Sequence, residues 1–417
     1  MTRSRKNALS HAVDGVFFHA GLVLLSRQVT MPKLITELSD SALLVGLIPV
    51  VWTVGVFLPQ TFHAQRVEGM AYKKSTVLLC GIVQRIGWVI FLISLFVYWG
   101  EVFTLGVFFL ALALASVGTG LAIPVWTDWF AKTTADSTWG KVLGIRRAMS
   151  GLVGIVIGHF LIRWVMATYP SPERYQVLVG IAVACFVISY AAVLMVEEEP
   201  RHGLPHHRES SWWEYMGHLK RILARRGGFR RFLIALLLAN TPIVLVMAFL
   251  TKYGLTHPGV GGEVTGSFTL FFFGASAVGS LAGGFLSDRR GVMFPMRLVP
   301  LFCIGSVAAA VVSSDPAMVC AAFALVGLAF GTRVTCMLPA IFRFAGPEQR
   351  PSYMAVSFTC MGLANAVLPP LVGALIDVDV LSFPVLFLGS GILSGASLLL
   401  FVNVPAPTAA DSRSSGN

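Results

Sequence analysis

Charged residues are scarce in this 417-residue sequence: Asp, Glu, Lys and Arg together make up only 12% of it. A soluble domain carries about twice that share. Hydrophobic residues account for 56%, so too few polar side chains are present to cover a water-soluble globule of this size. The composition therefore excludes a soluble globule, a disordered chain and a secreted enzyme. It indicates a protein whose main solvent is lipid.

Cysteine is also scarce, with six residues that all fall inside apolar stretches. No two of them have the spacing of a metal site, and this pattern excludes a disulfide scaffold. His202, His206 and His207 lie close together but lack Cys or carboxylate partners at zinc-binding spacing. The sequence therefore predicts no metal site.

The motifs of common enzymes are missing too. The chain has no glycine-rich phosphate loop opening a helix, no His-Glu-x-x-His run and no nucleophile elbow. We therefore expect neither an enzyme nor a bound cofactor. Without a nucleotide-binding loop, any transport would have to be driven by a gradient.

Apolar stretches long enough to cross a bilayer dominate the sequence. A helix needs about 20 residues to span a hydrocarbon core of about 30 Å, and the strand-like alternation of a membrane barrel is absent. The pattern predicts an all-α polytopic membrane protein with twelve transmembrane helices. The stretches lie near 12–36, 41–63, 75–98, 103–131, 144–168, 175–196, 231–253, 264–287, 298–313, 317–342, 352–377 and 381–404.

The basic residues are distributed unevenly between the two sides of these spans. Of the 31 Lys and Arg residues, 24 fall on the side that includes both termini, four on the other side and three within spans. Basic loops stay in the cytoplasm, so both termini are predicted to be cytoplasmic. The same asymmetry explains the net charge of +11 without any nucleic-acid partner. Compact loops and the lack of a targeting segment favour a prokaryotic inner membrane.

The longest connector divides the twelve spans into six and six. Its residues Trp212, Met216, Leu219 and Leu223 recur at helical spacing beside basic residues, which predicts an amphipathic helix at the lipid interface. The predicted organisation is an N-terminal bundle over 1–198, a linker over 199–230, a C-terminal bundle over 231–405 and a cytoplasmic tail over 406–417.

The loop after the eighth span carries a motif. It reads Gly-Phe-Leu-Ser-Asp-Arg-Arg-Gly over 284–291 and fits the pattern G-x-L-x-D-R-x-G. It resembles the signature loop of the major facilitator superfamily, whereas the equivalent first-half loop, 62–69, keeps only its final glycine in register. The resemblance implies two pseudo-symmetric six-helix bundles around a central cavity lined by the first, fourth, seventh and tenth spans.

In this architecture the motif implies a conformational latch. Gly284 and Gly291 would allow close packing and a sharp turn, and Asp288 would face the start of the fifth span. The latch residues would be Gly284, Asp288, Arg289 and Gly291, with Arg146 and Arg147 as their partners. The alternative is a loop that only fixes topology.

Two arginines lie inside spans that would line the cavity. Arg27 is in the first span and Arg333 in the tenth, and charged groups in lipid mark a pathway or a pair. Two guanidinium groups in one cavity favour a carboxylate, phosphate or sulfate ligand. The alternative is that each arginine pairs internally, Arg27 with a carboxylate such as Asp14 or Asp128.

Further polar residues complete the expected substrate site. His19, Ser26 and Thr30 share one face of a continuous first helix. Asn240 precedes Pro242 in the seventh span, and proline frees backbone carbonyls beside it; a simple kink is the alternative. Trp126, and Asn365 ahead of Pro369 and Pro370, are the remaining candidates.

Four ionisable residues are candidates for proton coupling: Asp14, His19, Asp128 and His159. Histidine titrates near neutral pH. The alternatives are a solvated or paired Asp14, an Asp128 bridged to Lys132 or Arg147, and histidines bonded to backbone. Arg85, in the peripheral third span, is expected to pair structurally.

Together these features predict a secondary active transporter that moves a small solute by alternating access. We expect proton coupling, a small organic anion as substrate and a monomer in the bilayer. One alternative is an efflux pump for amphipathic drugs or metabolites, which the many aromatic residues of the lining spans would suit. A different class is a non-transporting receptor or assembly factor on the same fold.

Overall fold

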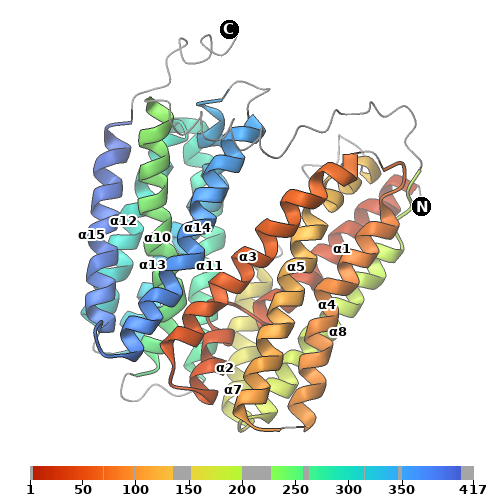
Figure 1. The fold of residues 1–417 in the computed structure, drawn as a ribbon, viewed down its shortest axis with the longest axis horizontal. Coiled ribbons are helices and arrows are strands. Elements are labelled where there is room, and N and C mark those ends of the chain that lie inside the picture. Colours follow the sequence, from red (N-terminus) through yellow and green to blue (C-terminus); the bar gives the residue numbers. More distant parts are fainter. Residues whose placement is uncertain are drawn as a thin grey trace. The chain divides into compact units, whose positions relative to one another are not determined.

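The computed structural model describes residues 3–68, 70–97, 99–134, 152–199, 227–256, 263–313, 315–345 and 350–404. Within these ranges the regular structure is entirely helical (Figure 1). The helices are α1 (Arg3–Leu24), α2 (Thr30–Leu38), α3 (Ala42–Glu68), α4 (Lys74–Val97), α5 (Glu101–Thr133), the π-helical η1 (Ile157–Ile162), α7 (Arg163–Thr168), α8 (Glu173–Leu194), α10 (Gly228–Gly254), α11 (Val264–Arg290), α12 (Met293–Val311), α13 (Pro316–Phe342), α14 (Arg350–Asp377) and α15 (Phe383–Val402).

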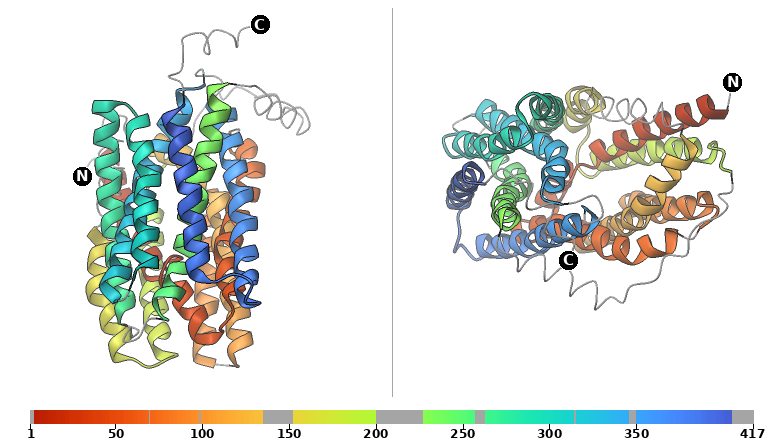
Figure 2. Two further views of the ribbon diagram at one scale, coloured as in Figure 1. Left: turned by 90° about the vertical axis from the view of Figure 1, so that its left-hand side faces the viewer. Right: turned by 90° about the horizontal axis from the view of Figure 1, so that it is seen from above.

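The chain forms two compact units. Unit 1 comprises Met1–Glu209 and Gly261–Leu270, and unit 2 comprises Ser210–Val260 and Phe271–Asn417. In unit 1, α1 packs along α8, and α5 packs against α3 and α4; Figure 2 shows α1 and α8 side by side. In unit 2, α15 packs against α10 and α12, and α12 also packs against α13.

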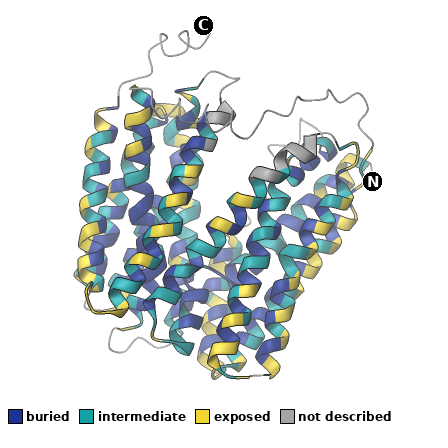
Figure 3. Ribbon diagram, viewed as in Figure 1, coloured by how far each residue is buried: buried dark blue, intermediate teal, exposed yellow. Residues whose placement is uncertain are grey.

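Apolar side chains cover the outside of both units. Most of the long helices carry both buried and exposed residues along their length (Figure 3). The outward faces carry large hydrophobic residues, such as Leu281, which is 74% exposed, and Ile392, which is 75% exposed. Exposed apolar surface on this scale is costly in water, so the exterior suits lipid.

Ten of the described helices are long and apolar enough to cross a membrane. This confirms an all-α membrane protein, while the number twelve stays a prediction. The fifth predicted stretch is described only from residue 152 to 168, where it contains η1 and α7. The first predicted span is not one continuous helix.

The first span is broken between α1 and α2. The Ser26 hydroxyl accepts the Thr30 N–H at 3.0 Å, and the Ser26 carbonyl accepts the Met31 N–H at 2.9 Å. These bonds satisfy donors at the start of α2 that have no partner within the helix. Pro32, which has no N–H, lies in that first turn, where none is needed. The expectation that His19, Ser26 and Thr30 share one face of a continuous helix is therefore wrong.

The helices α11 and α13 of unit 2 approach each other closely, and this contact sets the rotation of α13 about its axis. A Cβ added to Gly331 would lie 1.9 Å from the Ser276 carbonyl oxygen, so only glycine fits there. The next residue, Thr332, donates its hydroxyl to the Gly279 carbonyl at 3.1 Å. These contacts fix the rotation of α13 and therefore the direction in which Arg333 leaves it.

Candidate functional site

Three polar side chains from three helices of unit 2 form one hydrogen-bonded chain. Arg333 of α13 donates through Nη1 to Oδ1 of Asn240 on α10, at 2.5 Å. Asn240 donates through Nδ2 to Oδ1 of Asn365 on α14, at 2.8 Å. We call these three residues the unit 2 relay. The sequence singled out each of them, and the structure brings them together.

Arg333 keeps its positive charge uncompensated within the relay. It forms no ion pair with any described residue, and its Nε is buried without a hydrogen-bond partner there. Its guanidinium carbon lies 5.5 Å from the centre of the Phe330 ring. A desolvated cation is costly without a counter-charge, and no described carboxylate supplies one to Arg333.

Asn240 is fully buried, and both of its amide atoms contact protein. α10 continues as a helix through Pro242, and the freed carbonyls or kink beside Asn240 stay predictions. α14 likewise continues through Pro369 and Pro370. In this structure Asn240 positions its two neighbours.

Arg27 lies in unit 1, in the break between α1 and α2. Its guanidinium carbon is 3.8 Å from the centre of the Trp52 ring, a cation–π contact. Over the described ranges it makes no hydrogen bond and no ion pair, so the alternative pairing with Asp14 or Asp128 is not realised. Each half of the chain thus contains an arginine without a counter-charge among the described residues.

Asp14 belongs to a buried network in unit 1. It accepts the Ser189 hydroxyl at 2.7 Å, and Ser189 accepts Nη2 of Arg85 at 2.8 Å. Arg85 also donates to the carbonyls of Phe186 and Gly81, at 3.1 and 3.0 Å. Arg85 is thus held by backbone carbonyls and by Ser189, as the structural interpretation of this residue predicts.

The two histidines proposed for coupling differ. His19 donates through Nδ1 to the Gly15 carbonyl at 2.7 Å, which is the backbone-bonded alternative. His159 lies in η1, and its Nδ1 is buried without a hydrogen-bond partner among the described residues. π-Helical segments recur at functional sites, so His159 stays a candidate.

Trp126 packs into an aromatic cluster. It stacks on Phe130 with ring centres 5.1 Å apart and planes 21° apart, and it meets the edge of His11 at 6.5 Å. His11 is fully buried, with Nε2 2.9 Å from the Thr133 hydroxyl. The sequence analysis missed His11 because it precedes the predicted first span.

Charged residues gather at the end of unit 1 where α1 starts. We call them the charged cluster: Arg3, Lys6, Lys73, Lys74, Asp128, Lys132, Glu197, Glu198 and Glu199. Asp128 forms an ion pair with Lys73, while Lys132 pairs with Glu198 at 2.7 Å. The expected bridge from Asp128 to Lys132 is therefore wrong, and Arg147 lies outside the described residues.

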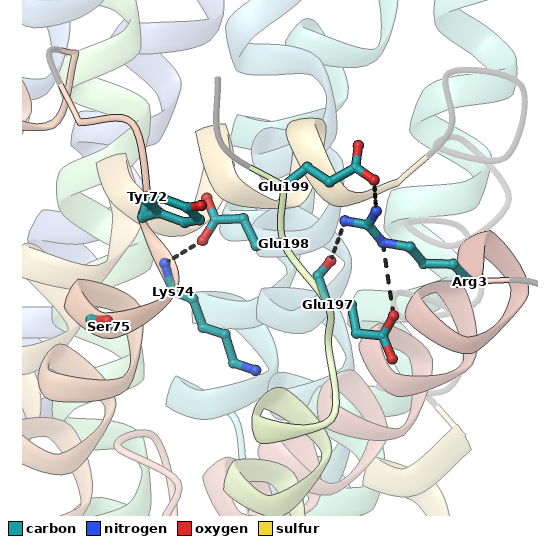
Figure 4. A pocket seen from close by; sticks show the side chains of 7 residues that line it. All are labelled: Arg3, Tyr72, Lys74, Ser75, Glu197, Glu198 and Glu199. Atoms are coloured by element: carbon teal, nitrogen blue, oxygen red, sulfur yellow. Dashed lines mark hydrogen bonds and ion pairs between the residues drawn. The ribbon is translucent and has the colours of Figure 1, made fainter. Parts of the chain in front are cut away.

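Seven residues, Arg3, Tyr72, Lys74, Ser75, Glu197, Glu198 and Glu199, line a pocket of about 540 Å³ in this region (Figure 4). Arg3 reaches Glu199, and Lys6 reaches Glu197. The hydrogen bond from Lys6, followed by the charges of Lys6, Arg3 and Lys74, lowers the pKa of Glu197 below its ordinary value of 4.5. The buried Asn7, which the sequence analysis did not single out, donates to the carbonyls of Thr133 and Glu197 at 3.1 and 2.9 Å.

The predicted latch is only partly described. Asp288 is exposed and makes no ion pair in the described part of the chain, and its expected partners Arg146 and Arg147 lie outside it. Arg289 covers the Phe285 ring at 4.1 Å. Gly291 adopts φ +78°, which explains the turn. The latch stays a prediction.

Gly284 does not provide the close packing expected of it. A Cβ added there would lie 3.7 Å from Thr335, an ordinary contact, whereas one on Gly283 would lie 3.2 Å from Thr332. The tight contact therefore comes one residue earlier. The predicted amphipathic helix of the linker and its histidines lie outside the described residues.

The chain matches the sequence model of a known family, and its fold is similar to that of solved structures. The family model of the Major Facilitator Superfamily matches residues 16–314 and 268–417. Three similar solved structures are the nucleoside transporter NupG, a peptide transporter POT in complex with sulfate, and a bacterial homolog to the human lysosomal transporter Spinster, inward-facing and unoccupied.

The TM-scores of these structures are 0.67, 0.69 and 0.66, at identities of 13%, 12% and 13%. The matches cover 99%, 96% and 99% of this chain and 100%, 93% and 98% of the other chains, respectively. At these identities the likeness concerns the fold. No curated protein sequence matches the chain.

Proposed function

The chain belongs to the major facilitator superfamily and is a membrane transporter by that membership. We propose that it is a secondary active transporter of a small organic anion and that a proton gradient drives the transport. It works by alternating access, as a monomer in a prokaryotic inner membrane with both termini in the cytoplasm. Membership of this family points to transport rather than to an enzyme. Its partners are the solute, protons and the lipid bilayer.

One observation carries the choice of an anion. Arg333 lies inside the apolar helix α13 and Arg27 in the break between α1 and α2, and neither pairs with a carboxylate of the described chain. A cation in lipid is costly, and a purely structural arginine would be expected to recover that cost through an acidic partner. An arriving carboxylate, phosphate or sulfate would supply the missing charge through strong, fork-like hydrogen bonds.

Proton coupling is assigned to Asp14, His19, Asp128 and His159. Asp14 is favoured among them, because it is buried and the Ser189–Arg85 network holds its carboxylate in place. Asp128 is engaged by Lys73, and His19 donates Nδ1 to backbone. The unpartnered Nδ1 of His159 makes it the second choice.

The test is transport by the full chain reconstituted in liposomes that contain a pH-sensitive dye. Succinate, benzoate, glucose 6-phosphate and the amphipathic cation tetraphenylphosphonium serve as probes. We expect saturable uptake of at least one anion with proton movement, and its loss in Arg333→Gln. The control Arg343→Gln changes an exposed arginine at the end of the same helix and should retain uptake.

Each outcome of this experiment decides one part of the proposal. Transport of the cation alone, unaffected by Arg333→Gln, would favour the efflux alternative over the anion. Anion uptake without proton movement would remove the coupling. No flux of any probe would favour a receptor or assembly factor.

A further inference from the structure

We infer that the unit 2 relay is an array of hydrogen-bond donors that binds an oxyanion through Arg333 and Asn365, with Asn240 as the residue that positions both. This inference rests on the proposed function and deepens it, because it assigns the contacts and excludes a cationic substrate at this site. The argument starts from the direction of the hydrogen bonds.

Arginine fixes that direction. A guanidinium group has five N–H donors and no acceptor, so the Asn240 atom facing Arg333 at 2.5 Å must be the carbonyl oxygen. The NH₂ group of Asn240 therefore points the other way, to Asn365, 2.8 Å distant. Asn365 must then accept with its oxygen, which leaves its own NH₂ group without a hydrogen-bond partner among the described residues.

The orientation of the Asn240 and Asn365 amide groups thus follows from the guanidinium group of Arg333. An isolated asparagine could be turned over, since its oxygen and nitrogen are nearly alike in shape. In the relay, turning Asn240 over would place NH₂ against the guanidinium group. Turning Asn365 over would place two NH₂ groups against each other. Neither arrangement forms a hydrogen bond.

The relay offers a ligand mainly donors, since each of its two carbonyl oxygens already has one of its two lone pairs engaged. Arg333 retains Nε, which is buried without a partner among the described residues, and also Nη2. Asn365 retains Nδ2, and its side chain is half-buried rather than enclosed. The two carbonyl oxygens of the relay already accept hydrogen bonds. A matching ligand presents several acceptor oxygens and negative charge, as a carboxylate, phosphate or sulfate does.

Asn240 does not touch this ligand. It is fully buried, so its contribution is to hold the guanidinium group and to orient the Asn365 amide. A cationic amphiphile would meet the positive charge of Arg333 and mainly N–H groups at this site, so both charge and hydrogen-bond polarity oppose its binding. The relay therefore discriminates by charge and by hydrogen-bond polarity together.

Replacing one amide by a carboxylate of the same shape tests the inference. Asn365→Asp still accepts the hydrogen bond from Asn240, so the protein should keep its melting temperature. It loses the free NH₂ group and adds a negative charge. We expect the affinity for succinate, inorganic phosphate or inorganic sulfate to fall by about 30-fold or more, measured by calorimetry on the purified full chain.

Asn240→Asp tests the positioning residue. Its carboxylate gives Arg333 a counter-charge, so anion affinity should fall although the melting temperature stays equal or rises. A merely structural role for Asn240 would lower the melting temperature instead. Asn403→Asp is the matched control, because Asn403 is exposed after α15 and its side-chain amide donates to the Leu399 carbonyl. It should leave anion affinity unchanged.

The outcomes separate this inference from the proposed function. If Arg333→Gln abolishes anion binding but Asn365→Asp retains it, the relay inference is overturned and the anion transporter stands. If the wild-type chain binds none of the three anions, or if Asn365→Asp lowers the melting temperature by more than Asn403→Asp does, the inference is also overturned. Loss of binding in both relay variants with intact melting temperatures supports it.

Discussion

Lys73 in unit 1 and Arg333 in unit 2 are both cations removed from water, but the protein surrounds them differently. Lys73 is 1% exposed and forms an ion pair with Asp128, whereas Arg333 is held by the neutral amide of Asn240. A carboxylate cancels the charge, while an amide orients the guanidinium group and leaves its charge in place. The first arrangement balances the charge within the protein, and the second leaves the charge of Arg333 for the anionic ligand of the proposed function.

Arg27 resembles Arg333 in charge and differs from it in support. It lies where the first span is broken and stacks on Trp52 at 3.8 Å, without a hydrogen bond to the described chain. Its position depends on the backbone between α1 and α2, whereas the position of Arg333 depends on a side-chain relay. This comparison of Lys73, Arg333 and Arg27 can be tested variant by variant.

The largest effect is expected on stability when the counter-charge of Lys73 is removed. Asp128→Asn should lower the free energy of unfolding by about 3 kcal/mol, near the lower end for a broken buried ion pair, because the Asp128 side chain is 37% exposed. Arg333→Gln should cost little, since no ion pair is lost. Thermal and denaturant unfolding of the purified protein measure both changes.

Asp379→Asn is the control for the loss of one carboxylate. Asp379 is exposed and adopts φ 57°, a conformation that Asn tolerates as well, so stability should not change. Equal stability losses in Asp128→Asn and Arg333→Gln would show that the two cations have the same structural role, and the comparison would fail.

The second effect concerns anion affinity when the positive charge of an arginine is kept and the shape of the cationic group is changed. Arg333→Lys retains a cation but loses the planar fork of donors, so we expect a loss of about 1.4 kcal/mol, or roughly tenfold. Arg27→Lys keeps a cation over Trp52 and should lose less than about threefold, or roughly 0.7 kcal/mol. Calorimetry with the anion that is transported gives both values.

A larger loss of anion affinity in Arg27→Lys than in Arg333→Lys would mean that the geometrically selective anion contact lies in unit 1. Equal losses would mean that charge alone matters and that the relay adds no geometric selectivity. Trp52→Leu separates the stacking from the charge at Arg27, since it should weaken anion affinity without changing the number of cations.

The sequence predicted the parts of this site better than their connections. Arg333, Asn240 and Asn365 are conspicuous because each is polar within an apolar stretch. Their assembly into one relay depends on the rotation of α13, which the contact of Gly331 with the Ser276 carbonyl fixes. Such a contact joins residues distant in the chain, and helical periodicity contains no information about it.

The break in the first span and the charged cluster were missed for different reasons. Pro32 is typical of a first helical turn and, with the polar run Ser26-Arg27-Gln28 before it, could have indicated the start of α2. Asn7 and Lys73 flank the predicted spans, where polar residues are ordinary. Their burial at 2% and 1% follows from the packing of loop and helix ends, which composition does not reveal.

The third effect concerns the backbone support of Arg27. Ser26→Ala removes the hydroxyl that accepts the Thr30 N–H at 3.0 Å, and the loss of one such hydrogen bond costs about 1 kcal/mol. It should also weaken anion binding, because Arg27 follows Ser26 directly. Hydrogen exchange at the start of α2 and calorimetry report the two changes.

Ser394→Ala is the matched control for Ser26→Ala. Ser394 is also buried, but its hydroxyl donates to the Ser390 carbonyl inside a continuous helix, where such a bond adds little. We expect no effect on anion affinity and only a minor one on stability. If both serines behave alike, the break has no special role in holding Arg27.

The smallest effect is expected where a paired charge faces water. Lys6 and Arg3 lower the pKa of Glu197, so its contribution to stability is present above the ordinary pKa of about 4.5 and is lost as the pH falls through the lower folded value. Exposed pairs contribute little, so the melting temperature of the wild type should fall slightly more between pH 6 and pH 3 than that of Glu197→Gln.

Above about pH 6 the two proteins should differ by a constant amount, and the difference should shrink at high salt because exposed charges are screened. A loss as large as that of Asp128→Asn would mean that exposure does not separate these two ion pairs.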